Sequence, residues 1–174
     1  MKQSDFAKAR FAFANMIAEY RAAEIWDSSL FGTLIDSWYA YERGGHFVKR
    51  PVSALQKVGN PRTFNNPNSE AEFRALREIP CRSIEADRVL KGVSAERLVK
   101  DHSIPRAVLR DLAFEELPFR PKAEDVDDWL RRRYRVAVLT KVEHDALPWP
   151  SSMPPSWDGH DHYCRYIGIK LVPQ

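Results

Sequence analysis

The residue types that bind metals and transfer protons gather near the carboxyl end of the chain, between Glu143 and Cys164. Imidazole, carboxylate and thiolate groups are the usual ligands of zinc and related metals. Two of the histidines are two residues apart, which would place both on one face of an extended strand. The stretch has no Cys-x-x-Cys or His-Glu-x-x-His motif, so we assign no metal and no cofactor. The residues that remain candidate metal ligands, as an alternative, are His144, His160, His162 and Cys164.

Other catalytic arrangements are not visible in the sequence. Gly44 and Gly45 end a predicted helix instead of opening one, so they do not form a phosphate-binding loop. Lys141, Glu143 and His144 could carry acid–base chemistry, but their spacing matches no nuclease motif. A loop rich in Pro and Trp, with exposed histidines, explains the same stretch without chemistry. We therefore predict that the protein is not an enzyme, and a metal-dependent nuclease-like activity is the third alternative.

The clearest structural pattern in the chain is three short helices between Ser83 and Leu117. Ser83 is a suitable N-cap for the first helix, and Gly92 suits the left-handed position after its end. The second helix is predicted from Ala95 to Asp101, and Pro105 falls in the first turn of the third. The short turn between the last two helices has the length found in a helix-turn-helix.

A DNA-binding helix-turn-helix reads the major groove with outward side chains near the start of its second helix. Arg106 and Arg110 occupy these positions, and Lys100 is placed for a phosphate contact. The far end of the same helix is acidic, so a packed three-helix unit without nucleic acid is the alternative. The predicted DNA-binding residues are Lys91, Lys100, Arg106 and Arg110.

A family pattern covers Ile79 to Glu116, under a quarter of the chain. It matches at Ile79, Pro80, Val89, Leu90, Gly92, Ser94, Glu96, Leu98, Val108, Leu112, Ala113 and Phe114. In these residues the segment resembles small bacterial helix-turn-helix antitoxins, a family of uncharacterised domains that pair with PIN-like toxins. The chain departs from the family pattern at Arg97, where a second acid is usual, and at Pro105-Arg106-Ala107, which replaces the acidic pair, and its strand segment is short. The resemblance implies a DNA-binding antitoxin with a protein toxin as its partner.

The first part of the chain, residues 1–45, predicts a hairpin of two amphipathic helices. Their apolar faces are expected to pack on each other, and Asp27 is a suitable cap for the second helix. Phe11, Trp26 and Tyr41 lie off these faces and could serve a dimer or a partner protein. A basic loop or linker is predicted over 46–68, and the helix-turn-helix core over 69–174, although a single domain would also fit the length.

The last third of the chain is predicted to contain one more helix and a small ribbon. Glu124 to Arg133 places acids first and arginines last, which complements the helix dipole. Arg135–Val142 and Tyr166–Val172 both alternate as strands do, so we expect them to pair antiparallel. Two strands alone are marginal, and a third could come from Phe47–Val48 or Ile79–Cys81. The predicted fold class is mainly α with a small antiparallel β ribbon (α+β).

Composition restricts the function less than these patterns do. A net charge of +3 does not require a polyanionic partner, and two cysteines give no disulfide framework, as expected in a reducing cytosol. The start of the chain lacks a signal-peptide core, so we predict a cytoplasmic protein with no membrane partner. The predicted function is a DNA-binding regulator or antitoxin whose aromatic hairpin mediates homodimerisation or binds a toxin. The alternative is a non-enzymatic protein–protein interaction subunit of a larger complex, which the surplus of aromatic side chains favours.

Overall fold

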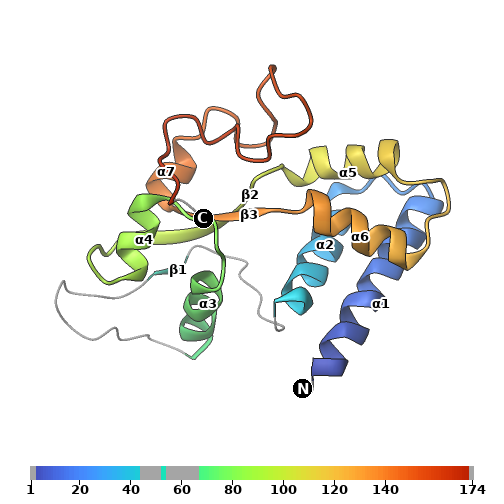
Figure 1. Ribbon diagram of the computed structural model, residues 1–174, viewed down its shortest axis with the longest axis horizontal. Helices are drawn as coiled ribbons and strands as arrows, with labels where there is room; N and C mark the ends of the chain where they lie inside the picture. The colour runs from blue at the N-terminus through green and yellow to red at the C-terminus, as the bar shows by residue number, and fades with distance from the viewer. Residues whose placement is uncertain (1–2, 44–51, 54–66, 173–174) are drawn as a thin grey trace. The chain divides into compact units, whose positions relative to one another are not determined.

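The computed structural model describes residues 3–43, 52–53 and 67–172, which form two compact units (Figure 1). The first unit contains Met1–Phe47, Ile104–Tyr134 and Ser151–Met153. The second contains Val48–Ser103, Arg135–Pro150 and Pro154–Gln174. The two helices between residues 104 and 134 therefore belong with the N-terminal hairpin, and not with residues 69–103 as predicted from the sequence.

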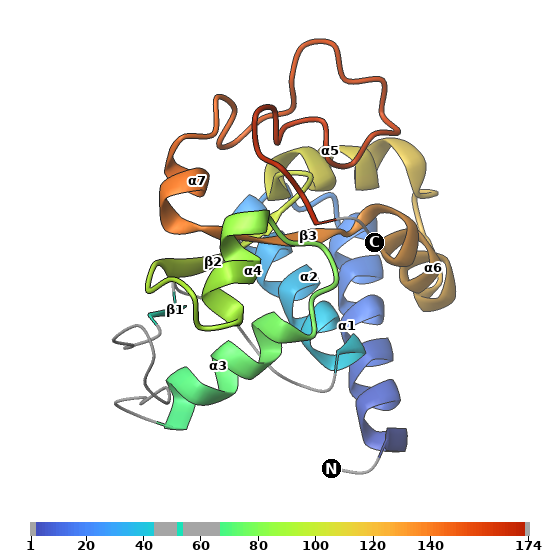
Figure 2. The same cartoon turned by 60° about the vertical axis from the view of Figure 1, so that its left-hand side comes forward.

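The first unit, here called the helical unit, is built from α1 (Gln3–Ala22), α2 (Ser28–Glu42), α5 (Arg106–Glu116) and α6 (Ala123–Arg133). Helices α1 and α2 form the predicted hairpin, with α6 packed on α1 and α5 on α2 (Figures 1 and 2). The side chain of Asp27 caps α2 by accepting the backbone N–H groups of Ser29 and Leu30 at 2.8 and 3.0 Å. The core includes Ala14, Ile17, Phe31, Ile35, Trp38, Leu109, Val126, Trp129 and Leu130.

A partly buried ion-pair network connects α1, α2 and α6. Asp127 of α6 accepts the Trp38 indole N–H at 2.8 Å and also lies 2.9 Å from Nε of Arg10 and 3.1 Å from Nε of Arg131. Glu42 of α2 pairs with both arginines at 2.7 Å. The two carboxylates match the two guanidinium groups, which offsets the cost of burying Asp127.

The second unit, here called the mixed unit, is built from β1 (Val52–Ser53), α3 (Pro67–Arg77), α4 (Ile84–Leu90), β2 (Arg97–His102), β3 (Val136–Thr140) and α7 (Lys141–Asp145). Its strands form an antiparallel sheet in the order β1-β2-β3, and α4 packs on β2 and β3 (Figure 2). One core cluster joins Cys81, Ala137, Leu139, Leu147 and Tyr166. The predicted fold class, mainly α with a small antiparallel β ribbon, is confirmed.

The predicted helix-turn-helix is wrong, because its first helix is the strand β2. Leu98 to His102 pair antiparallel with Val136 to Thr140 of β3, which is buried along its whole length. A helix of seven residues is not stable alone, whereas pairing with β3 satisfies the backbone of both strands. The helices on either side are confirmed as α4 and α5, but they belong to different units. Ser83 caps α4 through an Oγ that accepts the Ala86 N–H at 3.0 Å.

The predicted C-terminal ribbon is correct for only one of its strands. β3 forms, but residues 166–172 do not make a strand, because Gly168 adopts a φ of +82° and Ile169 N–H bonds back to the Tyr166 carbonyl at 3.0 Å. The other edge of β3 is covered by the segment around Ser83, whose N–H donates to the Val138 carbonyl at 2.9 Å. The proposed strand Phe47–Val48 and most of the basic loop 46–68 lie outside the described residues.

Candidate interaction surface

The turn between α1 and α2 places an exposed tryptophan on the helical unit. Ile25 N–H bonds to the Tyr20 carbonyl and Glu24 N–H to the Arg21 carbonyl, both at 3.2 Å, which is the pattern of a Schellman motif. Glu24 takes the left-handed position of this motif with a φ of +51°, where glycine is usual. The turn leaves Ile25 and Trp26 exposed to solvent.

Trp26 is fixed in place although 57% of its surface is exposed. Its ring stacks on Phe114 of α5 with centroids 3.8 Å apart and planes inclined by 22°. The Arg110 guanidinium lies 5.5 Å from the indole centroid and donates from Nη1 to the Trp26 carbonyl at 3.0 Å. Arg110 is itself held by Asp111, whose Oδ1 lies 2.5 Å from Nη2. The indole is therefore a rigid and largely exposed anchor.

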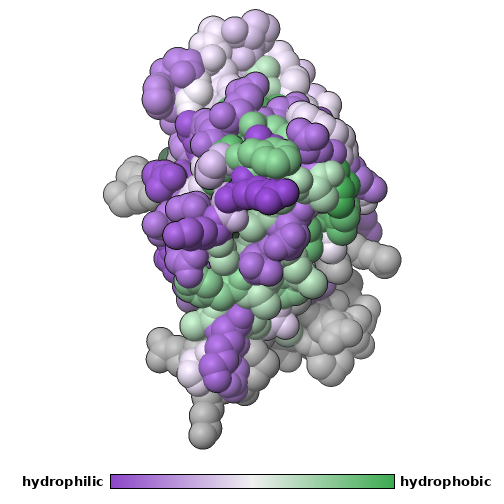
Figure 3. Space-filling model, turned by 90° about the vertical axis from the view of Figure 1, so that its right-hand side faces the viewer, coloured by the Kyte–Doolittle hydropathy of each residue, from purple (hydrophilic) through white to green (hydrophobic). Residues whose placement is uncertain are grey.

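A second exposed ring, Phe119, lies in the link between α5 and α6 and is 50% exposed. The Arg21 guanidinium lies 5.8 Å from its centroid and 4.7 Å from that of Phe114, and it donates to the Phe114 carbonyl at 3.1 Å. Arg120 lies 5.7 Å from the Phe119 centroid. We call this set the arginine–aromatic surface: Trp26, Phe114, Phe119, Arg21, Arg110 and Arg120. Figure 3 shows hydrophobic and strongly hydrophilic side chains alternating over one side of the molecule.

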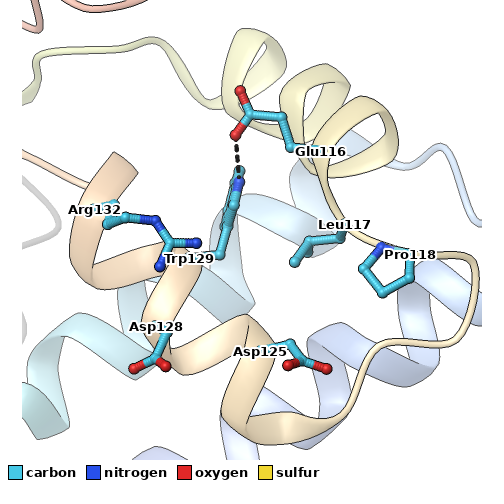
Figure 4. A pocket seen from close by; sticks show the side chains of 7 residues that line it. All are labelled: Glu116, Leu117, Pro118, Asp125, Asp128, Trp129 and Arg132. Atoms are coloured by element: carbon cyan, nitrogen blue, oxygen red, sulfur yellow. Dashed lines mark hydrogen bonds between the residues drawn. The ribbon is translucent and has the colours of Figure 1, made fainter.

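A cavity of about 310 Å³ is lined by residues of α5, of α6 and of the link between them (Figure 4). Its lining begins at Glu116, two residues after Phe114. Its indole wall is Trp129, whose Nε1 donates to Glu116 at 2.8 Å. The same carboxylate accepts two bonds from the Arg133 guanidinium, at 2.9 and 2.5 Å. Asp125 accepts the backbone N–H of Lys122 at 3.0 Å, at the start of α6. The complete lining is Glu116, Leu117, Pro118, Asp125, Asp128, Trp129 and Arg132.

The predicted DNA-binding residues do not lie on one pair of neighbouring helices, because they belong to different units. Lys91 and Lys100 belong to the mixed unit, whereas Arg106 and Arg110 belong to the helical unit. Lys91 pairs with Asp87 at 2.5 Å, and Arg106 donates to Asp36 at 2.6 Å. Arg110 bonds to Trp26 and Asp111 as described above. Both arginines at the start of α5 therefore hold partners within the helical unit.

The candidate metal ligands are not gathered into a site. In the part of the chain that the structure describes, no group of three or more His, Cys, Asp or Glu side chains could hold a metal ion. Nδ1 of His144 lies 3.3 Å from Asp145 and its Nε2 lies 3.5 Å from Asp101. Both contacts are with carboxylates, that of Asp101 on β2 and that of Asp145 on its own helix, and not with a second metal-ligand candidate.

The loop that carries the other candidate ligands is a turn and not the expected extended strand. Asp158 accepts the backbone N–H groups of His160 at 2.8 Å and Asp161 at 3.2 Å. Burial, together with the carboxylates of Asp161 and Asp158, raises the pKa of the Cys164 thiol. A raised pKa favours the protonated thiol, which is a poor metal ligand.

A buried polar cluster in the mixed unit anchors the C-terminal loop. Arg165 is 1% exposed and donates to the carbonyls of His102 at 2.7 Å and Pro150 at 3.0 Å. Tyr166 donates its hydroxyl to Asp101 at 2.9 Å. Burial and the Asp101 carboxylate raise the pKa of Tyr166 well above its ordinary value. These hydrogen bonds hold the C-terminal loop against β2, so we assign the cluster a structural role.

Part of the arginine–aromatic surface can be recognised in the sequence. Trp26 stood out because it lies off the apolar faces of the hairpin, while Phe114, Phe119, Arg21 and Arg120 were not recognised as site residues. The available signal was Phe119 itself, a large apolar residue in a short link between Pro118 and Arg120, where no helix face could bury it.

No protein-family model, curated protein or solved structure matches the chain. The antitoxin resemblance of residues 79–116 stays a prediction. Within residues 3–43, 52–53 and 67–172, no helix combines the length and the apolar character needed to cross a membrane.

Proposed function

We propose that the protein is a non-enzymatic interaction subunit that binds a partner protein through the arginine–aromatic surface. The observation that carries the proposal is a pair of half-exposed rings, Trp26 and Phe119, held by guanidinium groups from α1, α5 and the α5–α6 link. Tryptophan and arginine are enriched among the residues that dominate binding energy at interfaces. Side chains that are already fixed lose little conformational entropy on binding.

A protein partner fits this surface better than a nucleic acid does. Exposed rings among arginines also bind single strands, but that requires cations available to phosphates. The Arg110 side chain is only 19% exposed and already pairs with Asp111. In the adjoining cavity Glu116 is paired with Arg133, and Asp125 and Asp128 face Arg132, so the lining keeps one excess negative charge, which disfavours a polyanion. DNA binding by Lys91, Lys100, Arg106 and Arg110 stays a prediction without the helix-turn-helix that motivated it.

We place this binding in the cytoplasm as part of the same proposal. Among the described residues neither Cys81 nor Cys164 forms a disulfide bond, as is usual for proteins of a reducing compartment. The partner is proposed to be a different protein, and a second copy of this chain is an outcome that the experiment separates.

Photo-crosslinking in the cells that produce the protein tests the proposal. Benzoylphenylalanine replaces Phe119 in the tagged full chain, and the matched control carries it at Val142, an exposed position of the mixed unit. We expect a crosslinked protein from position 119 and not from position 142. That protein, identified by mass spectrometry and purified separately, should bind Trp26→Ala at least tenfold more weakly than wild type in calorimetry.

Three results would contradict the proposal. The first is no crosslink from position 119, and the second is equal affinity of wild type and Trp26→Ala for the captured protein. The third is a crosslink to nucleic acid or to a second copy of the chain, which would reassign the surface to strand binding or to a homodimer.

A further inference from the structure

We infer that the cavity between α5 and α6 receives a single lysine or arginine side chain of the partner. This inference rests on the proposed function, because the cavity lies next to Phe119 in the chain and would be covered by a protein docked there. Its volume of about 310 Å³ lies at the lower end of ligand-binding sites, which span about 300–1,000 Å³. The cavity therefore has room for one lysine or arginine side chain.

The charges that line the cavity call for one positive charge. Glu116 is matched by the two bonds from Arg133, which leaves Asp125 and Asp128 against Arg132. The remaining balance is one negative charge. A ligand with a single ammonium or guanidinium group would neutralise it, and a neutral or anionic ligand would not.

Asp128 is the carboxylate available to such a ligand. Within the described residues it has no hydrogen bond or ion pair, and it does not pair with Arg132 one turn later. The same spacing on the same helix does produce a pair between Asp127 and Arg131, at 3.1 Å. Figure 4 shows Asp128 and Arg132 on α6 at one side of the cavity, with Trp129 between them and Leu117.

The other walls suit the aliphatic stem of a basic side chain. Pro118 supplies exposed apolar surface. Leu117 and Trp129 are 5% and 2% exposed and form the base of the cavity, where the indole is fixed because its N–H is bonded to Glu116. Lysine and arginine bury their methylene stems on such surfaces while the charged head meets a carboxylate. An indole ring adds attraction for a nearby cation.

Nuclear magnetic resonance titration of the full chain tests the inference directly. The probes are Nα-acetyl-lysine amide and Nα-acetyl-arginine amide, with Nα-acetyl-norleucine amide as the uncharged control, and the readout is the Trp129 indole N–H resonance. We expect a saturable shift with the two basic probes and none with norleucine. Asp128→Asn should weaken binding about tenfold, equivalent to about 1.4 kcal/mol. Glu124→Gln, an exposed acid of α6 outside the cavity lining, should leave it unchanged.

The inference and the proposed function can fail separately. Equal shifts with norleucine, or unchanged binding by Asp128→Asn, would overturn the cavity assignment, while crosslinking from position 119 could still succeed. If the basic probes bind but the captured partner binds Asp128→Asn as tightly as wild type, the side chain that fills the cavity does not come from that partner, and the inference is also overturned.

Discussion

Arg110 contacts Trp26 twice: its guanidinium lies 5.5 Å from the indole centroid, and its Nη1 lies 3.0 Å from the Trp26 carbonyl. The first contact orients the ring and the second fixes the backbone of the α1–α2 turn. The arginine that the sequence analysis assigned to DNA is therefore engaged in holding the exposed tryptophan.

Replacing Arg110 with methionine should loosen Trp26. Methionine keeps an apolar stem but loses both contacts, so we expect a loss of about 1 kcal/mol in the free energy of unfolding. The Trp26 indole resonance should broaden or shift, and affinity for the captured partner should fall five- to tenfold. Arg120→Met is the matched control, because Arg120 stacks on Phe119 and should leave the Trp26 resonance unchanged. An unaltered Trp26 resonance in Arg110→Met would contradict the role assigned to Arg110.

Glu24→Gly should stabilise the helical unit. The left-handed φ of +51° costs a residue with a Cβ about 1–2 kcal/mol, while glycine adds about 0.5–1 kcal/mol of unfolded-state entropy. We expect a net gain of about 0.5 kcal/mol in the free energy of unfolding, measured by urea denaturation. The comparison is with Glu24→Ala, which removes the same charge and keeps the Cβ. If both variants are equally stable, the turn is not strained at Glu24.

The fold could be predicted where its signals are local. Asp27 and Ser83 marked the starts of α2 and α4 because a cap acts within three residues of its own position. β2 could not be recognised in this way, since its conformation depends on pairing with β3 some forty residues later. The arginine–aromatic surface could not be predicted for the same reason, because the hydrogen bond from Arg21 to the Phe114 carbonyl joins residues 93 positions apart. Local patterns identify an exposed tryptophan but not the arginines that hold it.

Gly32 and Arg106 should be strongly coupled. A Cβ at Gly32 would lie 2.6 Å from Cδ of Arg106, so alanine there must displace the side chain that pairs with Asp36 at 2.6 Å. Alanine gains about 1 kcal/mol over glycine within a helix, and losing the ion pair costs a similar amount. Gly32→Ala should therefore be close to neutral in wild type and stabilising by about 1 kcal/mol in the Arg106→Ala background. A double-mutant cycle of unfolding free energies measures this coupling, and additive effects would contradict it.

Alkaline pH should destabilise the protein through its buried tyrosines. Burial, and then the Asp36 carboxylate that accepts the Tyr134 hydroxyl at 2.7 Å, raise the pKa of Tyr134 well above 10.0. The folded chain then keeps a proton that the unfolded chain has lost, so the free energy of unfolding falls as the pH rises above 10.0 and is unaffected well below it. Tyr134→Phe and Tyr166→Phe should each reduce this alkaline slope in denaturation measured at a series of pH values. An unchanged slope in both variants would show that these hydroxyls titrate normally.

Asp127→Asn should destabilise the helical unit. The carboxylate is buried and is shared by Arg10, Arg131 and the Trp38 indole N–H. Asparagine can still accept the indole N–H but leaves two guanidinium groups with only Glu42. Because Arg131 is 41% exposed and can be solvated, we expect a cost of about 1–2 kcal/mol. The neighbouring Asp128→Asn supplies the control, because that exposed carboxylate has no partner among the described residues and its loss should cost less than about 0.5 kcal/mol. Urea denaturation of the two variants side by side measures the difference. Equal stability would mean that the network between α1, α2 and α6 does not hold the unit together, and the frame on which the arginine–aromatic surface depends would have to come from apolar packing alone.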